Sequence, residues 1–233
     1  MKDKEFFDVF VDKYAAYQVY PDTEYRRIIV STGILHEPRT MKVLEPGCGT
    51  GAFTIRLATA GFETTGLDIS PLSIQAAQRL HTGRTNISFI AGDILKMPFP
   101  DESFDSIFCG AILHHLPDQL SLCADEFFRV LKPNGSVYFY EPNANNINAF
   151  IWYKILSYNR TTNERALDPD DVKNVFERHG FKDFRFSALK RIQHIYCYPQ
   201  DSLFRKVMGI SRKFINEYVF PNEFFSGCCR KIS

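Results

Sequence analysis

The chain has 233 residues, and its formal net charge is only +1, with 24% charged residues scattered along its length. That length allows one sizeable hydrophobic core, and no shift in composition marks a second unit, so we expect a single domain. A nearly neutral chain lacks the basic surface typical of proteins that bind nucleic acids or anionic membranes. We therefore expect no nucleic-acid partner and a small or weakly charged ligand.

The N-terminal stretch "MKDKEFFDVFVDKYAAY" mixes acids with aromatics. It contains no uninterrupted apolar run of the kind that a signal peptide or a membrane-spanning helix needs. The six cysteines show no CxxC spacing, which argues against a zinc knuckle or a thioredoxin-like pair. We expect reduced thiols, a cytoplasmic location and no integral membrane segment.

The predicted elements alternate along the chain. Residues 1–40 are expected to form two helices, interrupted near Pro21, and short apolar β-rich segments follow at 41–46, 64–69, 87–92, 103–110 and 135–142. Helices are predicted between several of them, at 52–61, 70–80 and 120–135. Strands alternating with helices predict a parallel sheet with right-handed crossovers. Beyond Pro142 we expect helices at 143–158 and 168–181, and final strands at 183–192 and 223–232.

Local signals mark the ends of two predicted helices. Gly61 is expected to cap the C-terminus of the first helix between strands. Ser70 has the position of an N-cap, and Pro71 occupies the first helical position after it. The third helix is expected to end at Pro133 and Gly135.

A glycine loop follows the first strand of the predicted sheet. In "VLEPGCGTG", residues 43–51, an acid and a proline precede three glycines that alternate with small residues. Such a loop lets backbone N–H groups and a helix N-terminus approach a ligand that a Cβ atom would hold off. "GCGTGA" also satisfies GxGxxA, with Asp68 about 20 residues on to hold a ribose, as in dinucleotide sites. On this pattern alone, a dinucleotide and a tight turn without a ligand both remain open.

Three acids at the ends of successive predicted strands narrow this choice. Glu45 lies where a pyrophosphate would have to sit, and it would repel that anion while attracting an ammonium or sulfonium centre. Asp93, in "AGDIL", suits the acceptance of a hydrogen bond from an adenine amine. Because open α/β sheets bind ligands outside the carboxyl ends of their strands, these acids and Asp68 should face one crevice. They favour S-adenosylmethionine over NAD.

Four motifs occur in one order and spacing: "VLEPGCGTG", "TGLDIS", "AGDILKMPFPDESFDSIFCGAILHHLPD" and "LKPNGSVYFYEPN". Together they resemble the class I S-adenosylmethionine-dependent methyltransferases, in particular the branch with quinone-biosynthesis, sterol and sugar O-methyltransferases. The resemblance covers residues 41–142 as a cofactor-binding core. It implies a Rossmann-like, doubly wound, mostly parallel seven-stranded sheet with helices on both faces. An N-terminal helical lid at 1–40 and a C-terminal antiparallel strand, within acceptor-side elements at 143–233, complete the expected architecture.

The resemblance also implies a set of residues around the methionine part of S-adenosylmethionine. That set is Glu45, Gly47, Cys48, Gly49 and Gly51 in the loop, with Cys109 and Gly110 offering backbone beneath the methionyl carbon chain.

For the nucleoside part, the resemblance implies a second set. Asp68 would hold the ribose hydroxyls and Ile69 would pack on adenine, which Asp93 and Ile94 would frame. Tyr14, on the helix similar to a lid, is the candidate to close over the cofactor, and packing on the core is the alternative for it.

Methyl transfer from a sulfonium needs mainly positioning, exclusion of water and removal of the acceptor's proton. His114 and His115, in "ILHHLPD" just beyond the fourth strand, are candidates for the catalytic base, with a packing role as the alternative for each. His114 replaces the glutamate with which some relatives bind a metal, so we expect no metal. Glu141 is a further candidate for orienting a substrate, with a cap or loop role as its alternative.

The acceptor is expected to be a small molecule, methylated at oxygen: a glycan, a natural product or a lipid-linked metabolite. An amphipathic stretch at 199–220 would either roof an apolar pocket or form a core-facing or dimer contact, in a monomer or homodimer. An NAD-binding oxidoreductase and a non-catalytic binding protein with the same fold are the alternatives.

Overall fold

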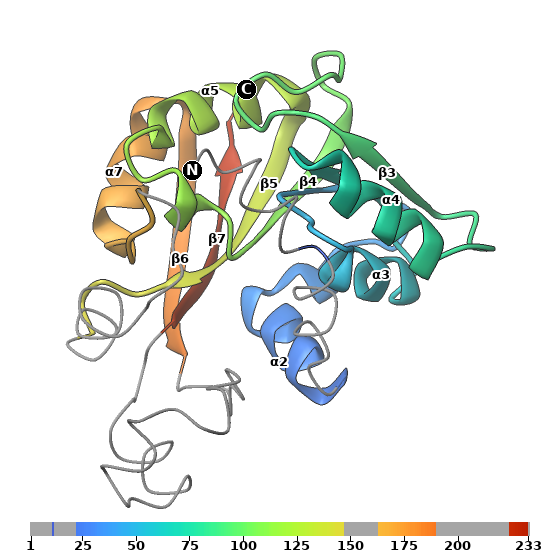
Figure 1. Ribbon diagram of the computed structural model, residues 1–233. Coiled ribbons are helices and arrows are strands. Elements are labelled where there is room, and N and C mark those ends of the chain that lie inside the picture. Colours follow the sequence, from blue (N-terminus) through green and yellow to red (C-terminus); the bar gives the residue numbers. More distant parts are fainter. Residues whose placement is uncertain (1–10, 12–21, 147–162, 190–223, 233) are drawn as a thin grey trace, which may run out of the picture.

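A computed structural model describes residues 11, 22–146, 163–189 and 224–232 (Figure 1). It contains one seven-stranded sheet in the order β3-β2-β1-β4-β5-β7-β6. The strands are β1 Lys42–Pro46, β2 Glu63–Asp68, β3 Ile87–Ala91, β4 Phe104–Gly110, β5 Leu131–Pro142, β6 Phe181–Leu189 and β7 Phe224–Lys231. The first five are parallel to one another, and β7 runs antiparallel between β5 and β6.

Helices cover both faces of this sheet (Figure 1). They are α2 Asp22–Thr32, α3 Ala52–Thr59, α4 Pro71–Leu80, α5 Leu120–Val130 and α7 Pro169–Arg178, with short 3-10 helices η1 Ile34–His36 and η2 Leu113–His115. The α5 and α7 side is filled by a large apolar cluster around Phe127, Phe139 and Phe176. The opposite cluster joins α2 and α3 to the sheet through Tyr25 and Leu57. None of the described helices is long and apolar enough to cross a bilayer.

The predicted fold class is therefore confirmed, including the C-terminal antiparallel strand. Ser70 caps α4 by accepting a hydrogen bond from the Ser73 N–H at 3.1 Å, with Pro71 at the first helical position. Gly61, with φ of 108°, follows the end of α3 in the left-handed conformation expected of a glycine there. The predicted helix at 143–158, the stretch at 199–220 and most of the predicted lid lie outside the described residues.

One predicted boundary is wrong. Helix α5 ends at Val130 rather than at Pro133, and β5 begins at once with Leu131, which pairs with Phe104. The residue before a proline is disfavoured in the helical conformation, so the chain leaves the helix before Lys132.

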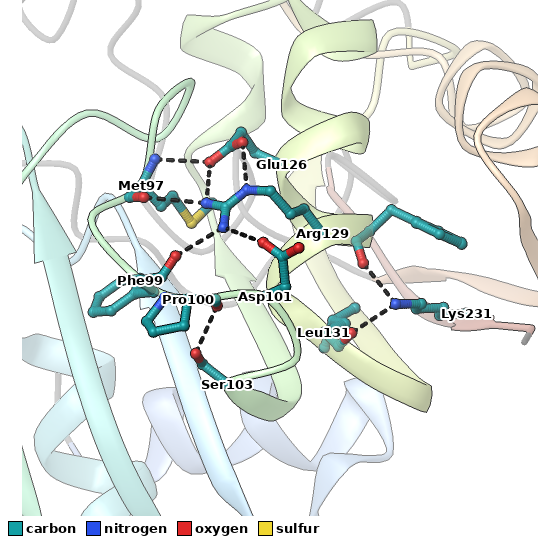
Figure 2. Close-up of polar contacts among 10 residues, drawn as sticks. Met97, Phe99, Pro100, Asp101, Ser103, Glu126, Arg129, Leu131 and Lys231 are labelled. Atoms are coloured by element: carbon teal, nitrogen blue, oxygen red, sulfur yellow. Dashed lines mark hydrogen bonds and ion pairs between the residues drawn. The ribbon is translucent and has the colours of Figure 1, made fainter.

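Arg129 on α5 holds the connection between β3 and β4 in place (Figure 2). Its guanidinium donates to the backbone oxygens of Met97 and Phe99, at 3.1 and 2.7 Å, and to the carboxylates of Asp101 and Glu126. Glu126 in turn accepts the Met97 N–H at 2.8 Å. Residues 97–101, which form neither helix nor strand, are thereby fixed against α5.

Lys231, near the end of β7, fastens the C-terminal end of α5 to the sheet (Figure 2). Its ammonium donates to the backbone oxygens of Phe128 and Leu131, at 2.9 and 2.8 Å, and lies 4.3 Å from the centre of the Phe128 ring. Although charged, the side chain is buried. The last carbonyls of a helix lack partners within the helix, and this lysine supplies a cationic one.

Lys231→Met should lower the free energy of unfolding by about 1.5–3 kcal/mol, because two buried carbonyl groups lose a charged donor. Lys42→Met is the matched control, since the Lys42 side chain forms an exposed ion pair with Glu63 whose loss should cost less than about 1 kcal/mol. Urea denaturation measures both, and equal effects would contradict the capping role.

Candidate functional site

The candidate site lies where β1 and β4 are neighbours. The chain continues from β1 toward one edge of the sheet through β2 and β3, and from β4 toward the other edge through β5. Open α/β sheets bind ligands at such a switch point, outside the carboxyl ends of the strands.

The glycine loop leaves β1 with all three glycines in the left-handed region, at φ of 68° for Gly47, 54° for Gly49 and 88° for Gly51. Gly51 is the N-cap residue of α3, and no side chain in the described part of the chain caps that helix end. A Cβ at Gly47 would lie 2.3 Å from Ile112 Cδ1, and one at Gly51 2.7 Å from the Phe89 ring. Packing as well as backbone conformation therefore requires these two glycines.

Glu45 is fully enclosed directly behind this loop, with 2% of its surface exposed. Its carboxylate accepts a hydrogen bond from the Thr54 hydroxyl on α3. Burial raises the pKa of Glu45 to about 8, partly opposed by the bonds from Thr54. A cation entering the crevice would stabilise the ionised form, so this side chain is suited to a positively charged ligand.

Asp68, at the end of β2, organises the turn opposite the loop. One carboxylate oxygen accepts the Gly49 N–H at 2.8 Å, and the other accepts the Ser70 N–H at 2.9 Å. The neighbouring Ile69 is 40% exposed. Asp68 is half-buried at this edge of the sheet.

The end of β3 joins the same edge. The Gly92 N–H donates to the Asp68 backbone oxygen at 2.9 Å, which brings Asp93 next to the end of β2. Asp93 is exposed and accepts the Leu95 N–H at 2.9 Å, whereas the Ile94 side chain is buried in the core cluster beneath. The adenine contact predicted for Ile94 could therefore come from its backbone and not from its side chain.

Two cysteines predicted to line the site have side chains in the core. Cys48 packs with Ile74, Ala77 and Phe89 under α4. Cys109 belongs to the apolar cluster on the α5 side. Burial raises the pKa of each thiol well above its ordinary value. These residues therefore offer the crevice their backbone only, as does Gly110, where a Cβ would meet the Phe53 ring at 2.7 Å.

After β4 the chain turns sharply toward β5. Ala111 has φ of 61°, a conformation that costs energy for a residue with a Cβ, and its N–H donates to the Tyr140 oxygen at 2.8 Å. The turn aims the start of η2 at Glu141, whose buried carboxylate accepts the N–H groups of Ile112 and Leu113 at 2.9 and 2.8 Å. Burial raises the pKa of Glu141 to about 8, with these backbone bonds opposing the shift.

The histidine pair sits on this turn, with ring centres 4.2 Å apart. His114 Nδ1 lies 2.8 Å from a Glu141 carboxylate oxygen. Burial, and then the proximity of His114, lowers the pKa of His115 well below its usual value, so this ring is neutral near pH 7. Both imidazoles approach Glu164, at 3.7 Å from His114 Nε2 and 3.7 Å from His115 Nδ1.

The structure thus groups Glu45, Asp68 and Asp93 at one edge and places the histidines beyond β4. Tyr14 lies outside the described residues.

Sequence reasoning missed Thr54 and Glu164. Thr54 is one turn into α3, where a hydroxyl near the preceding strand's acid could have been noticed, but the loop around Glu164 carries no signal that pairs it with residues 50 positions earlier.

Comparison with known proteins identifies the family to which the chain is similar. Residues 38–180 match the profile of a family described as a methyltransferase domain. The chain is 36% identical over 107 residues to a demethylmenaquinone methyltransferase of Bacillus licheniformis, covering 45% of this chain and 46% of that protein. A Staphylococcus aureus enzyme of the same name is 35% identical over 115 residues, covering 48% and 46%. The chain therefore spans about half the length of the curated relatives it matches.

Among solved structures, a Thermotoga maritima protein described as an S-adenosylmethionine-dependent methyltransferase, possibly for histamine nitrogen, superposes with a TM-score of 0.69. It is 16% identical, and the match covers 99% of both chains. At this identity the likeness concerns the fold.

The raised pKa of Glu45 makes stability depend on pH. The folded state keeps this proton up to about pH 8, whereas the unfolded chain releases it near 4.5, so the stability contributed by the protonated form is lost as pH rises between these values. Glu45→Gln removes this titration. In urea denaturation, we expect the free energy of unfolding of the variant, relative to that of wild type, to rise by on the order of 3 kcal/mol between pH 5 and pH 8. A difference between the two proteins that stays constant with pH would show that Glu45 is ionised in the folded state.

Proposed function

Because the chain belongs to the class I S-adenosylmethionine-dependent methyltransferase family, we propose that it transfers the methyl group of S-adenosylmethionine to an oxygen of a small-molecule acceptor. The observation that carries the proposal is the buried carboxylate of Glu45 behind a glycine loop, at the carboxyl edge of the sheet. S-adenosylmethionine supplies a methyl group activated by a sulfonium, and the protein contributes binding, orientation and a dry surrounding.

The methionine end of the cofactor would lie over Gly47, Gly49 and Gly51. Its ammonium would face Glu45, which then ionises and releases a proton. Its carboxylate suits the N-terminus of α3, where N–H groups and the helix dipole favour an anion. The backbone at Cys48, Cys109 and Gly110 would line the same part.

The nucleoside end would lie toward β2 and β3. We place its ribose hydroxyls on Asp68, and its adenine between the exposed Ile69 and the Asp93–Ile94 backbone. Tyr14 stays the candidate to close the site. A dinucleotide is disfavoured, because it brings no ammonium to Glu45, so the buried carboxyl group would stay protonated and form no ionic contact with it.

The acceptor would approach from the end of β4, beside His114 and His115. His115 is neutral near pH 7, as a group that accepts a proton must be, and Glu141 orients His114. The demethylmenaquinone methyltransferases among the relatives make a quinol-type ring the first acceptor to test.

Five cysteines in the described residues have no disulfide partner, which fits the proposed cytoplasmic location, and we propose a monomer or homodimer.

Asp68→Ala should weaken the binding of S-adenosylmethionine by roughly 1.5–3 kcal/mol, or about 10- to 150-fold, since hydrogen bonds to a charged group are lost. Asp105→Ala is the matched control: Asp105 also accepts a backbone N–H, from Lys42 at 2.8 Å, but lies at the opposite, amino end of the sheet. Calorimetric titration should show that the Asp105→Ala variant binds S-adenosylmethionine with the affinity of wild type. Equal losses in both variants would rule out the ribose assignment.

The proposed activity is tested by methyl transfer itself. Cofactor with a labelled methyl group is incubated with the protein and a panel of quinol, phenolic, glycan and amine acceptors. We expect label on the oxygen of a hydroxyl-bearing acceptor, with turnover lost in Asp68→Ala. Cofactor binding without transfer to any acceptor class would favour a non-catalytic binding protein, and label found only on nitrogen or on a ring carbon would overturn the oxygen assignment.

A further inference from the structure

Three metal-ligating side chains meet beyond the end of β4. One donor atom each from His114, His115 and Glu164 lies within 4.8 Å of the other two. Although the sequence alone predicted no metal, we propose that these three side chains bind a divalent transition-metal ion.

The spacing is close to that of a formed site. Metal–nitrogen and metal–oxygen distances of about 2.0–2.2 Å place two tetrahedral ligand atoms about 3.4 Å apart. Glu164 Oε1 lies 3.7 Å from His114 Nε2, and its Oε2 lies 3.7 Å from His115 Nδ1. Small rotations of the side chains would complete the geometry.

Glu141 supplies the second layer of such a site. It lies 2.8 Å from His114 Nδ1, and its other bonds come from backbone N–H groups that only donate. Metal binding at Nε2 selects the tautomer with the proton on Nδ1, so the Nδ1–H group then donates to Glu141 and the Nε2 lone pair faces Glu164. Metal-bound histidines usually carry a carboxylate on the other ring nitrogen in this way.

Glu164 is held beside the histidines by its own segment of chain. The N–H of the following residue, Arg165, donates to the His114 backbone oxygen at 3.0 Å, and the Leu167 N–H donates to that of Pro142 at 2.9 Å. The Arg165 guanidinium forms an ion pair with Asp118 at 2.9 Å. The backbone thus brings Glu164 to the pair, while the adjacent positive charge is engaged elsewhere.

Two imidazoles and one carboxylate suit zinc, iron or cobalt, whereas magnesium and calcium prefer sites made of oxygen. The three side chains are 7%, 14% and 16% exposed, so the ion would be largely enclosed. Three protein ligands leave at least one coordination position open. Its chemical role rests on the proposed function: a bound metal ion would lower the pKa of an acceptor hydroxyl, which would then lose its proton to solvent before its oxygen takes the methyl group and S-adenosylhomocysteine leaves.

The test uses Co²⁺ as the probe, with the full chain first treated with a chelator. We expect one equivalent to bind and to give visible absorption bands without the intense thiolate band that cysteine ligands would produce. Glu164→Gln and His115→Ala should each weaken binding at least 10-fold, and Glu141→Gln should weaken it about 10- to 100-fold through the second layer. His36→Ala, which removes an exposed imidazole on η1, should change nothing, and Mg²⁺ should not compete.

Absence of saturable Co²⁺ binding would overturn the proposal, as would binding that Glu164→Gln and His115→Ala both leave intact. If His115→Ala fails to fold, Glu164→Gln decides, because its side chain keeps nearly the same shape. The titration needs neither cofactor nor acceptor. Measuring S-adenosylhomocysteine binding on the same samples therefore separates a failure of the metal site from a failure of the proposed function.

Discussion

Two acidic side chains buried at the carboxyl ends of β1 and β5 hold the neighbouring segments of chain against the sheet. Glu45 and Glu141 flank β4 in the sheet, and burial raises the pKa of each to about 8. Burying an acid costs free energy unless hydrogen bonds replace water. Glu45 receives its bond from Thr54 and so ties α3 to β1, while Glu141 binds the backbone of η2 and so ties the turn after β4 to β5.

From these two acids we infer different tasks for the two halves of the sheet's carboxyl edge. The β1–β3 half presents backbone N–H groups, Asp68 and an exposed apolar side chain, which suit a nucleoside and an amino-acid chain. The β4–β5 half presents two imidazoles and Glu164, which suit proton or metal chemistry at an acceptor. The family profile covers both, at residues 38–180, whereas the solved structures share the fold at 16% identity in the case compared. The family profile thus identifies the reaction class, and neither comparison identifies the acceptor.

Patterns local in the sequence predicted much of this arrangement. The cap formed by Ser70 and Pro71, the left-handed Gly61 and the strand ends carrying Glu45, Asp68 and Asp93 all depend on neighbours within a few residues. The early end of α5 could have been read from Pro133. The inward-facing Cys48 side chain and the pairing of Glu164 with the histidines could not, because they depend on contacts between distant segments that no periodicity encodes.

We propose that the glycine loop, with Glu45 behind it, binds a nucleoside that carries an ammonium group and does not bind a dinucleotide. Calorimetric titration of the ligand-free protein with S-adenosylhomocysteine and with NAD tests it most directly. The account predicts saturable binding of S-adenosylhomocysteine at one site per chain and no detectable heat with NAD, with affinity rising from pH 6 toward the pKa of Glu45, at about 8, as its carboxyl group ionises. Binding of NAD as tight as that of S-adenosylhomocysteine, or tighter, would contradict it.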